Sequence, residues 1–232
     1  MKIIGIDYSI NSPGVCFYDG KNIKFGTLAR NNVCSMEFKN ILKERNVYVI
    51  DFPNYETKET NIKISREFTQ DAIKQANELI KMCKIFGMQE QEKEKNIIVF
   101  EGFSFRSRSN RLAQLAGYQY IARNKLIEKL SIIENLYVYS PQTIKKIAGV
   151  KKADQTKNAM INKFIFHENK LCGLENHPFY IELSKNENSK FRKKLKNGKI
   201  TNSWIKPIDD IVDSYWIVYT FLIEQGILLK NF

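Results

Sequence analysis

Residues 2–7 (KIIGID), 14–19 (GVCFYD) and 22–28 (NIKFGTL) stand close together near the start of the chain, and these three runs decide the fold. Each run is short and rich in apolar, β-branched or aromatic residues, as expected of β-strands. The Asp-Gly pair at positions 19 and 20 separates the second run from the third and is typical of a tight hairpin turn. The opening of the chain therefore predicts three consecutive antiparallel strands.

Helical and strand patterns alternate after this opening. Apolar residues recur at helical spacing over residues 64–86, and further helices are expected over about 108–131, 153–166 and 209–224. Strand patterns cover residues 96–100 (NIIVF) and 136–139. The order predicts an α/β fold, with a mixed five-stranded sheet of three antiparallel and then parallel strands, flanked by helices. We expect a single domain over residues 1–232, with insertions at about 29–62 and 168–206; the first contains a possible short helix near 35–44 and a strand-like VYVIDF at 47–52.

Charge and cysteine usage set broad limits on the kind of protein. The chain of 232 residues carries 37 Lys and Arg against 25 Asp and Glu, a formal net charge of +12. This excess favours polyanionic partners, although a Lys-rich coding bias would produce it too. The four cysteines are scattered and form no CxxC pair, which favours a reducing compartment. With no secretory signal pattern and no membrane-length apolar run, the sequence predicts a cytoplasmic protein without a membrane partner, in a bacterium or a phage-infected cell.

Four acidic residues lie where separate elements would bring them together. Asp7 ends the first strand and Glu101 follows the fourth, while Asp210 and Asp213 share one face at the start of the last helix. Taken singly, each has an ordinary explanation as a turn former, a strand-end cap or a complement to the helix dipole. Together they match the needs of phosphodiester hydrolysis by two Mg²⁺ ions roughly 4 Å apart, which requires several converging carboxylates.

Three segments, in this order, carry a resemblance to a known family: GIDYSINSPGV (5–15), FEGFSF (100–105) and DDIVDS (209–214). They resemble the RNase H-like superfamily and, within it, the RuvC type of Holliday-junction resolvase. The resemblance implies that Asp7, Glu101, Asp210 and Asp213 form the catalytic set and hold two Mg²⁺ per site, with Mn²⁺ as a plausible substitute. Ser214 stands where the family usually has Ala.

The same resemblance points to a lysine near the scissile phosphate. Residues 141–145 (PQTIK) resemble the family segment that leads to this lysine, which makes Lys145 a candidate. The family usually has a second basic residue at the position of Gln155, whereas here Lys157 comes two residues later. Lys145 and Lys157 are therefore both candidates for the catalytic role, and Lys151 and Lys152 lie nearby as candidate DNA contacts.

Aromatic and basic residues alternate after Glu101. The candidate DNA-binding residues here are Phe103, Phe105, Arg106, Arg108 and Arg111. Guanidinium groups bind phosphates, and an exposed ring can stack on bases or wedge between them. In the family that the chain resembles, this segment supplies an aromatic that probes the junction centre, and the resemblance implies that Phe103 or Phe105 has this role. We expect one of the two phenylalanines to be buried and the other to contact DNA, with Phe105 favoured for DNA.

The helix expected over 108–131 and the basic stretch at 185–206 also have possible partners. Ala113, Ala116 and Gly117 resemble the close-packing positions of the family's dimer helix, although this helix could equally pack on its own sheet. Residues 185–206 carry eight Lys or Arg and one Glu around Asn197-Gly198, a possible hairpin tip. This stretch is either a solvated loop or an arm over the DNA, and its candidate contacts are Arg192, Lys193 and Lys194.

These features predict an Mg²⁺-dependent endodeoxyribonuclease that acts as a homodimer and resolves four-way DNA junctions by symmetric nicking. The alternative is a related nuclease for flaps, other branched DNA or RNA–DNA hybrids. Actin-like ATPases and sugar kinases share the G-I-D opening, but 11 glycines without a GxGxxG motif and a chain too short for two such domains argue against them. A non-catalytic DNA-binding module is disfavoured because all four carboxylates are present.

Overall fold

The computed structural model describes residues 1–54, 61–103, 110–151, 158–195 and 197–229, and the side chains of 61–65, 110 and 111 are not described. The strands are β1 (Lys2–Asp7), β2 (Gly14–Tyr18), β3 (Ile23–Arg30), β4 (Val47–Phe52), β5 (Asn96–Glu101), β6 (Leu136–Tyr139), β7 (Arg192–Lys194) and β8 (Ile200–Trp204). The helices are α1 (Met36–Glu44), α2 (Asn61–Phe86), α3 (Asn110–Leu130), α4 (Pro141–Ile147), α5 (Ala159–Phe166), α6 (Pro178–Ser184) and α7 (Ile208–Glu224), with short 3₁₀ turns η1 (Glu90–Lys95), η2 (Ile133–Asn135) and η4 (Asn186–Asn188).

The main sheet confirms the predicted fold class and corrects the number of strands. Its order is β4-β3-β2-β1-β5-β6. The first three strands pair antiparallel, and β5 and β6 continue from β1 in parallel. The prediction of five strands was wrong, because β4 adds a sixth, parallel to β3 at the edge of the sheet. Val47 and Val49 of β4 are buried on the α7 side of the sheet and Phe52 on the other side, while Tyr48 is exposed, so the strand adds to both cores.

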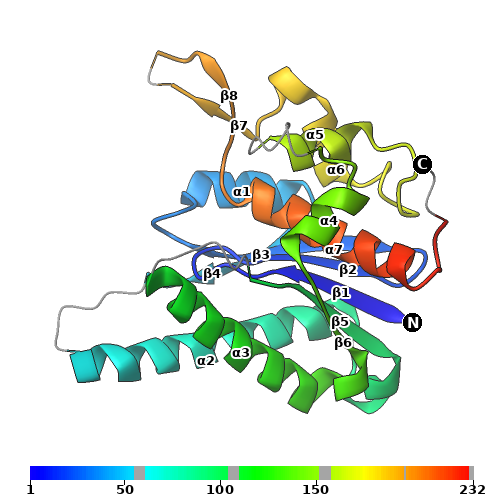
Figure 1. Cartoon of the computed structure of the whole chain (residues 1–232). Helices are drawn as coiled ribbons and strands as arrows, with labels where there is room; N and C mark the ends of the chain where they lie inside the picture. The colour runs from blue at the N-terminus through cyan, green and yellow to red at the C-terminus, as the bar shows by residue number, and fades with distance from the viewer. Residues whose placement is uncertain (55–60, 104–109, 152–157, 196, 230–232) are drawn as a thin grey trace.

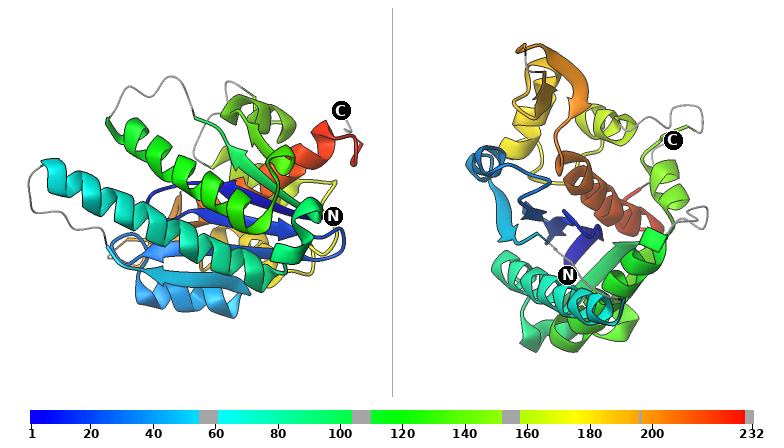
Figure 2. Two further views of the ribbon diagram at one scale, coloured as in Figure 1. Left: turned by 90° about the horizontal axis from the view of Figure 1, so that it is seen from below. Right: turned by 90° about the vertical axis from the view of Figure 1, so that its left-hand side faces the viewer.

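Helices cover both faces of this sheet (Figures 1 and 2). Helices α2 and α3 lie on one face, where Ile4 and Ile6 of β1 point into the core. Helix α7, with α1, α4, α5 and α6 around it, lies on the other face, which receives Ile3. Among the described residues, no helix combines the length and the apolar character that crossing a membrane would need.

Two glycines allow α7 to lie directly on the central strands. A Cβ atom built on Gly14 would lie 2.0 Å from the backbone oxygen of Asp210, and one built on Gly5 would lie 2.5 Å from that of Ser214. Any larger residue at Gly14 would push the start of α7 away from β2. These close approaches fix the position of α7 along the strands, and with it the position of the acidic residues in its first turns.

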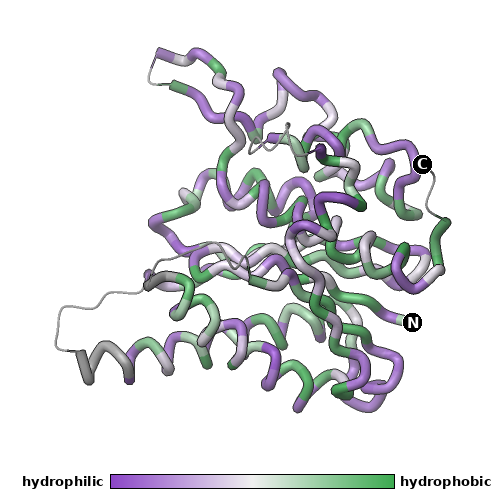
Figure 3. The backbone as a smooth tube through the Cα atoms, in the orientation of Figure 1, coloured by the Kyte–Doolittle hydropathy of each residue, from purple (hydrophilic) through white to green (hydrophobic). Residues whose placement is uncertain are grey.

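The predicted insertion at 168–206 has more regular structure than its composition indicated. It contains α6 and a hairpin of β7 and β8, which projects from the body of the molecule and is mostly hydrophilic (Figures 1 and 3). Around the predicted tip, the amide of Leu195 donates to the carbonyl of Lys199 at 2.9 Å and that of Gly198 to the carbonyl of Leu195 at 2.9 Å. Two residues after β8 ends, the chain reaches Lys206 and then α7.

Candidate active site

The strand register brings Asp7 and Glu101 together. Ile6 of β1 pairs with Phe100 of the parallel strand β5, so the next residues, Asp7 and Glu101, lie side by side where both strands end. A side-chain hydrogen bond joins the two carboxyl groups. Asp7 is also paired with Gly14 across the ladder between β1 and β2. Because Gly14 lies against the backbone of Asp210, the start of α7 is close to Asp7 as well.

Helix α7 supplies the other two acids. Asp210 is 5% exposed, and both of its oxygens have partners: Ser12 Oγ donates to Oδ2 at 2.5 Å, and Lys206 Nζ donates to Oδ1 at 2.5 Å. Lys206 also forms an ion pair with Asp209 at 2.7 Å. Asp213 has a different environment, because its Oδ1 is buried and has no hydrogen-bond partner. The four predicted carboxylates therefore come from β1, β5 and α7 and gather at the carboxyl ends of the two neighbouring strands β1 and β5.

Burial and mutual repulsion shift the protonation of this group. Burial, followed by the charges of Glu101, Asp210 and Asp213, raises the pKa of Asp7 well above its ordinary value. Burial and the neighbouring carboxylates also raise the pKa of Asp213 well above its ordinary value. The pKa of Asp210 rises to about 6, mainly through burial, although Lys206 and Ser12 oppose the shift. The pKa of Glu101 rises through burial too, while the hydrogen bond from Asp7 and the charge of Lys145 counteract it. The group carries more negative charge than its surroundings neutralise.

Lys145 lies beside this group. Together with Glu101, Asp213 and the apolar residues Ile144, Met160 and Ile217, it lines a hollow of about 20 Å³. This volume is enough for one water-sized occupant. The capping of α4 places the lysine here: Ser140 accepts a hydrogen bond from the amide of Thr143 at the start of the helix, and Ile144 anchors the helix in the core. Lys157, the other lysine candidate, lies outside the described residues.

The donor chemistry of the group suits a divalent cation. Mg²⁺ and Mn²⁺ prefer carboxylate oxygens, and the unpartnered Oδ1 of Asp213 is a buried acceptor that a cation would satisfy. Still, no three His, Cys, Asp or Glu side chains in the described ranges are arranged to hold a metal ion as they stand. Each oxygen of Asp210 accepts one hydrogen bond, from Lys206 and from Ser12. The residues fit the ion chemically, but the ligand cage is not formed.

Sequence reasoning missed two residues of this site. Lys206 lies four residues before Asp210, but it precedes Pro207, the N-cap of α7, so no rule of helical spacing points to it. Ser12 gave no signal either, because 198 residues separate it from Asp210. Asp209, in the first turn of α7, also forms an ion pair with Lys206.

The candidate DNA-binding residues are only partly described. Phe103 is partly buried, and the guanidinium of Arg123 lies 5.8 Å from the centre of its ring. Lys151 follows α4 and is exposed. The remaining candidates in these two segments lie outside the described residues or, for Arg111, have an undescribed side chain; they are Phe105, Arg106, Arg108, Arg111 and Lys152.

The three candidates on the β7–β8 hairpin have two different environments. Lys193 and Lys194 are exposed. Arg192 is only 6% exposed: its guanidinium lies 3.6 Å from the centre of the Trp204 ring and donates to the carbonyls of Asn186 and Asn202. The structure therefore uses Arg192 to hold the hairpin together, and leaves the two lysines facing solvent.

The small residues of α3 face two different ways. A Cβ atom built on Gly117 would lie 3.4 Å from the Phe68 ring of α2, so this glycine packs against its own chain. Ala113 is exposed, and Tyr120, two turns further along α3, is 68% exposed. One side of α3 thus packs on its own chain, while another side carries exposed apolar and aromatic surface.

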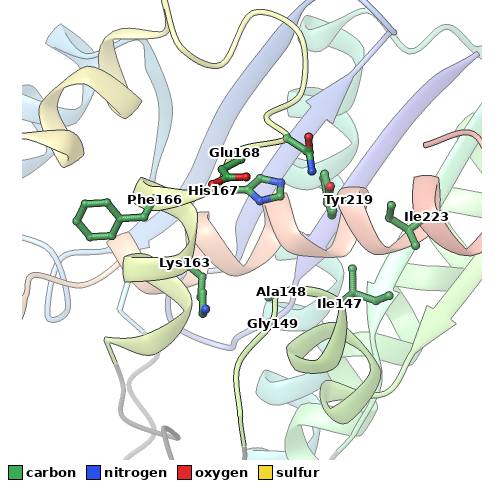
Figure 4. Close-up of a pocket in the computed structure, with 10 residues that line it drawn as sticks. Ile147, Ala148, Gly149, Lys163, Phe166, His167, Glu168, Tyr219 and Ile223 are labelled. Atoms are coloured by element: carbon green, nitrogen blue, oxygen red, sulfur yellow. The ribbon is translucent and has the colours of Figure 1, made fainter. Parts of the chain in front are cut away.

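A larger pocket lies further along α7. Its volume is about 270 Å³, and side chains from α4, α5 and the second half of α7 line it, as Figure 4 shows. His167 packs edge-on against Tyr219 with ring centres 4.6 Å apart, and its buried Nε2 has no hydrogen-bond partner. Lys163 is the cationic residue of the lining. No predicted site residue lines this pocket.

Comparison with known proteins finds similarity in structure only. No protein-family model matches the sequence, and no curated protein does. The chain resembles RuvC-type Holliday-junction resolvases. The RuvC of Thermus thermophilus in complex with a Holliday-junction substrate is 14% identical, with 97% of each chain covered and a TM-score of 0.45. The same RuvC solved separately is 11% identical, again with 97% of each chain covered and a TM-score of 0.45. The yeast mitochondrial Holliday-junction resolvase Ydc2 is 15% identical, with 97% of this chain and 78% of that chain covered and a TM-score of 0.48.

Proposed function

We propose that this protein is a divalent-metal-dependent endonuclease that resolves four-way DNA junctions. The observation that carries the proposal is the group of Asp7, Glu101, Asp210 and Asp213, in which burial and mutual repulsion raise every pKa and Asp213 Oδ1 has no partner. A purely structural cluster of this kind would cost stability without return, because buried like charges repel. A bound cation would turn the same arrangement into a stable one.

The proposed roles follow from chemistry and position. Asp7, Glu101, Asp210 and Asp213 would hold two Mg²⁺ ions, for which Mn²⁺ is a chemically similar substitute. When bound, the ions supply Lewis acidity at the scissile phosphodiester. Lys145 borders the hollow next to Glu101 and Asp213, where its ammonium group would balance negative charge on the phosphate in the transition state. Lys157 stays a second candidate for this role.

The projecting hairpin and the segments after Glu101 and α4 would contact the DNA. Lys193 and Lys194 are exposed on β7, and Lys151 is exposed after α4, so all three can reach phosphates without losing another partner. Phe103, one residue beyond Gly102 at the end of β5, lies close in sequence to Glu101, where an aromatic side chain could reach an unstacked base. We also propose DNA contacts for five further residues, through the ring of Phe105 and the positive charges of Arg106, Arg108, Arg111 and Lys152. Extended basic contacts of this kind suit a substrate with several duplex arms.

Symmetric nicking of a four-way junction requires two active sites related by a two-fold axis, so we propose a homodimer. The exposed side of α3, with Ala113 and Tyr120, supports a contact surface on this helix. We further propose that residues 1–232 act as a single nuclease domain.

The proposal is tested by cleavage of labelled four-way junction, flap, duplex and RNA–DNA hybrid with Mg²⁺, for the wild type and for Asp7→Asn. We expect paired symmetric nicks on the junction with the wild type, no cleavage with Asp7→Asn, and junction binding by both. Binding should be as strong or stronger in the variant, since it carries one negative charge fewer.

Other outcomes would change the proposal in defined ways. Cleavage restricted to flaps or RNA–DNA hybrid would support the alternative substrates and retain the metal site. Loss of junction binding in Asp7→Asn would contradict the assignment of Asp7 as a metal ligand without a role in DNA binding. Absence of cleavage on every substrate would contradict the nuclease function itself.

A further inference from the structure

Lys206 contacts Asp210, one of the four carboxylates proposed to hold the metal ions. Its Nζ lies 2.5 Å from Asp210 Oδ1 and 2.7 Å from Asp209 Oδ2. The other oxygen of Asp210 accepts from Ser12, so both of its oxygens have a partner, whereas Asp213 Oδ1 has none. An ammonium ion in direct contact with a carboxylate neutralises it much as a metal would. A cation bound at Asp210 Oδ1 would be repelled by the ammonium group, so movement of Lys206 away from Asp210 favours its binding.

The surroundings of Lys206 allow such a movement. Its side chain is 44% exposed, whereas that of Asp210 is 8% exposed, so the lysine can turn toward solvent while the aspartate stays in place. The charged groups that face it are Asp209 and Asp210 of α7, with Asp7 and Asp213 further away. Ser12 would keep Asp210 oriented after the lysine leaves. The ion pair is thus the part of the site that can open without repacking the core.

The position of Lys206 in the chain connects it to the proposed DNA-binding surface. It lies two residues beyond β8, the second strand of the hairpin whose other strand carries the exposed Lys193 and Lys194. A phosphate that arrives at the carboxylate group would bring new negative charge within reach of the ammonium group. Lys206 can then exchange a carboxylate partner for a phosphate partner, and the two interactions have the same sign and similar strength.

We propose that Lys206 is a positioning residue that competes with the divalent cation for Asp210, so that the site loads metal weakly until DNA draws the lysine away. This inference rests on the proposed metal-dependent function. Lys206 would thereby make full metal binding follow DNA binding. A complete active site would then not form on the free protein.

The test is calorimetric titration of the full-length protein with Mn²⁺ in the absence of DNA. Lys206→Met removes the charge and keeps most of the aliphatic stem, and we expect it to bind Mn²⁺ about tenfold more tightly than the wild type. Lys206→Arg should resemble the wild type. Lys199→Met is the matched control, because it removes one charge from an exposed hairpin residue and should leave Mn²⁺ affinity unchanged. With a phosphorothioate-protected junction present, the difference between wild type and Lys206→Met should largely disappear.

A second measurement uses the wild type alone and does not depend on how a variant folds. Lys206 should react slowly with an amine-specific acylating reagent in metal-free protein, since two carboxylates hold it, and faster when Mn²⁺ saturates the site. Mass spectrometry of the labelled peptides reports this, with Lys199 as the internal reference. Equal Mn²⁺ affinities for wild type and Lys206→Met, or labelling of Lys206 that does not respond to Mn²⁺ at saturation, would overturn the inference while the metal site stands. If no variant binds Mn²⁺, with or without the junction, both this inference and the proposed function fail.

Discussion

Two groups of buried charge lie on opposite sides of the sheet, and they are built on opposite principles. Under α2 and α3, Arg30 forms an ion pair with Asp71, and its remaining donors bind the carbonyls of Ile10 and Pro53. Tyr118 donates to the same aspartate. At the end of β1, by contrast, four carboxylates share the charge of Lys206 and the influence of Lys145, and Asp213 Oδ1 has no partner.

The difference in partners distinguishes a group with a structural role from the group for which we propose a catalytic role. A buried ion pair in which every donor and acceptor is satisfied is stable as it stands, and removal of one member leaves an uncompensated charge. A buried group with surplus negative charge is destabilised in the free protein, and removal of one member relieves repulsion. Both groups contain buried aspartates, so burial alone does not distinguish them. The number of partners does.

The largest expected effect is on the satisfied group. Arg30→Met should lower the free energy of unfolding by about 3–5 kcal/mol, because Asp71 would remain buried without its ion-pair partner. Urea denaturation at pH 7 measures this. Arg66→Met, at an exposed position on α2, is the control and should change stability by less than about 0.5 kcal/mol. A loss below about 1 kcal/mol in Arg30→Met would mean that the two groups do not differ in the way described.

A matched pair of substitutions then tests the difference directly. Asp213→Asn should slow junction cleavage roughly 10²–10³-fold, about 3–4 kcal/mol in transition-state stabilisation. In EDTA the same change should raise the melting temperature, since it removes one of the repelling charges. Asp71→Asn is the same chemical change in the satisfied group and should lower the melting temperature. Thermal denaturation of both variants provides the readout, and equal destabilisation by the two changes would contradict the comparison.

The smallest expected effect is a pH dependence. The folded-state pKa of Asp210, raised to about 6, lies above its unfolded value, so the folded protein binds more protons between pH 4 and 7 and loses stability as pH rises through 6. His167 and His177 have pKa values lowered by burial and act in the opposite direction, which makes a variant necessary as the reference. Between pH 5.5 and 7.5 in EDTA, the wild type should lose about 1 kcal/mol more stability than Asp210→Asn does. Urea denaturation of both proteins at the two pH values measures this, and parallel behaviour would refute it.

Sequence patterns were sufficient for those parts of the fold that depend on local periodicity. The hairpin signal at Asp19-Gly20, the apolar runs of β1 and β5 and the spacing within α7 predicted the core strands and the faces of the helices. They also predicted that Asp7 and Glu101 would meet, because acids at the ends of neighbouring parallel strands lie side by side. The edge strand β4 was recognised as strand-like but not as part of the sheet, since nothing in its sequence shows with which strand it pairs.

The parts of the site that sequence could not predict depend on contacts between distant segments. Ser12 lies in the β1–β2 connection, and only the close packing of Gly14 on α7 places it beside Asp210. Composition also gave no sign that Arg192 packs within its own hairpin. The ring of Trp204 and two backbone carbonyls make it part of the hairpin's own structure. Charge counts describe a segment, whereas the partners of each charge depend on the fold.

The span between Ser12 and Asp210 also has a consequence for the time course of biosynthesis. A ribosome adds the 198 residues between them in roughly 10–40 s at typical elongation rates. During that interval Ile3 and Cys16, whose side chains pack into the core on the α7 side of the sheet, lack the helix that lies on β1 and β2. The nascent chain therefore carries an incompletely covered sheet face and an incomplete carboxylate group until α7 has emerged, and the proposed cleavage activity should appear only once synthesis has passed that helix.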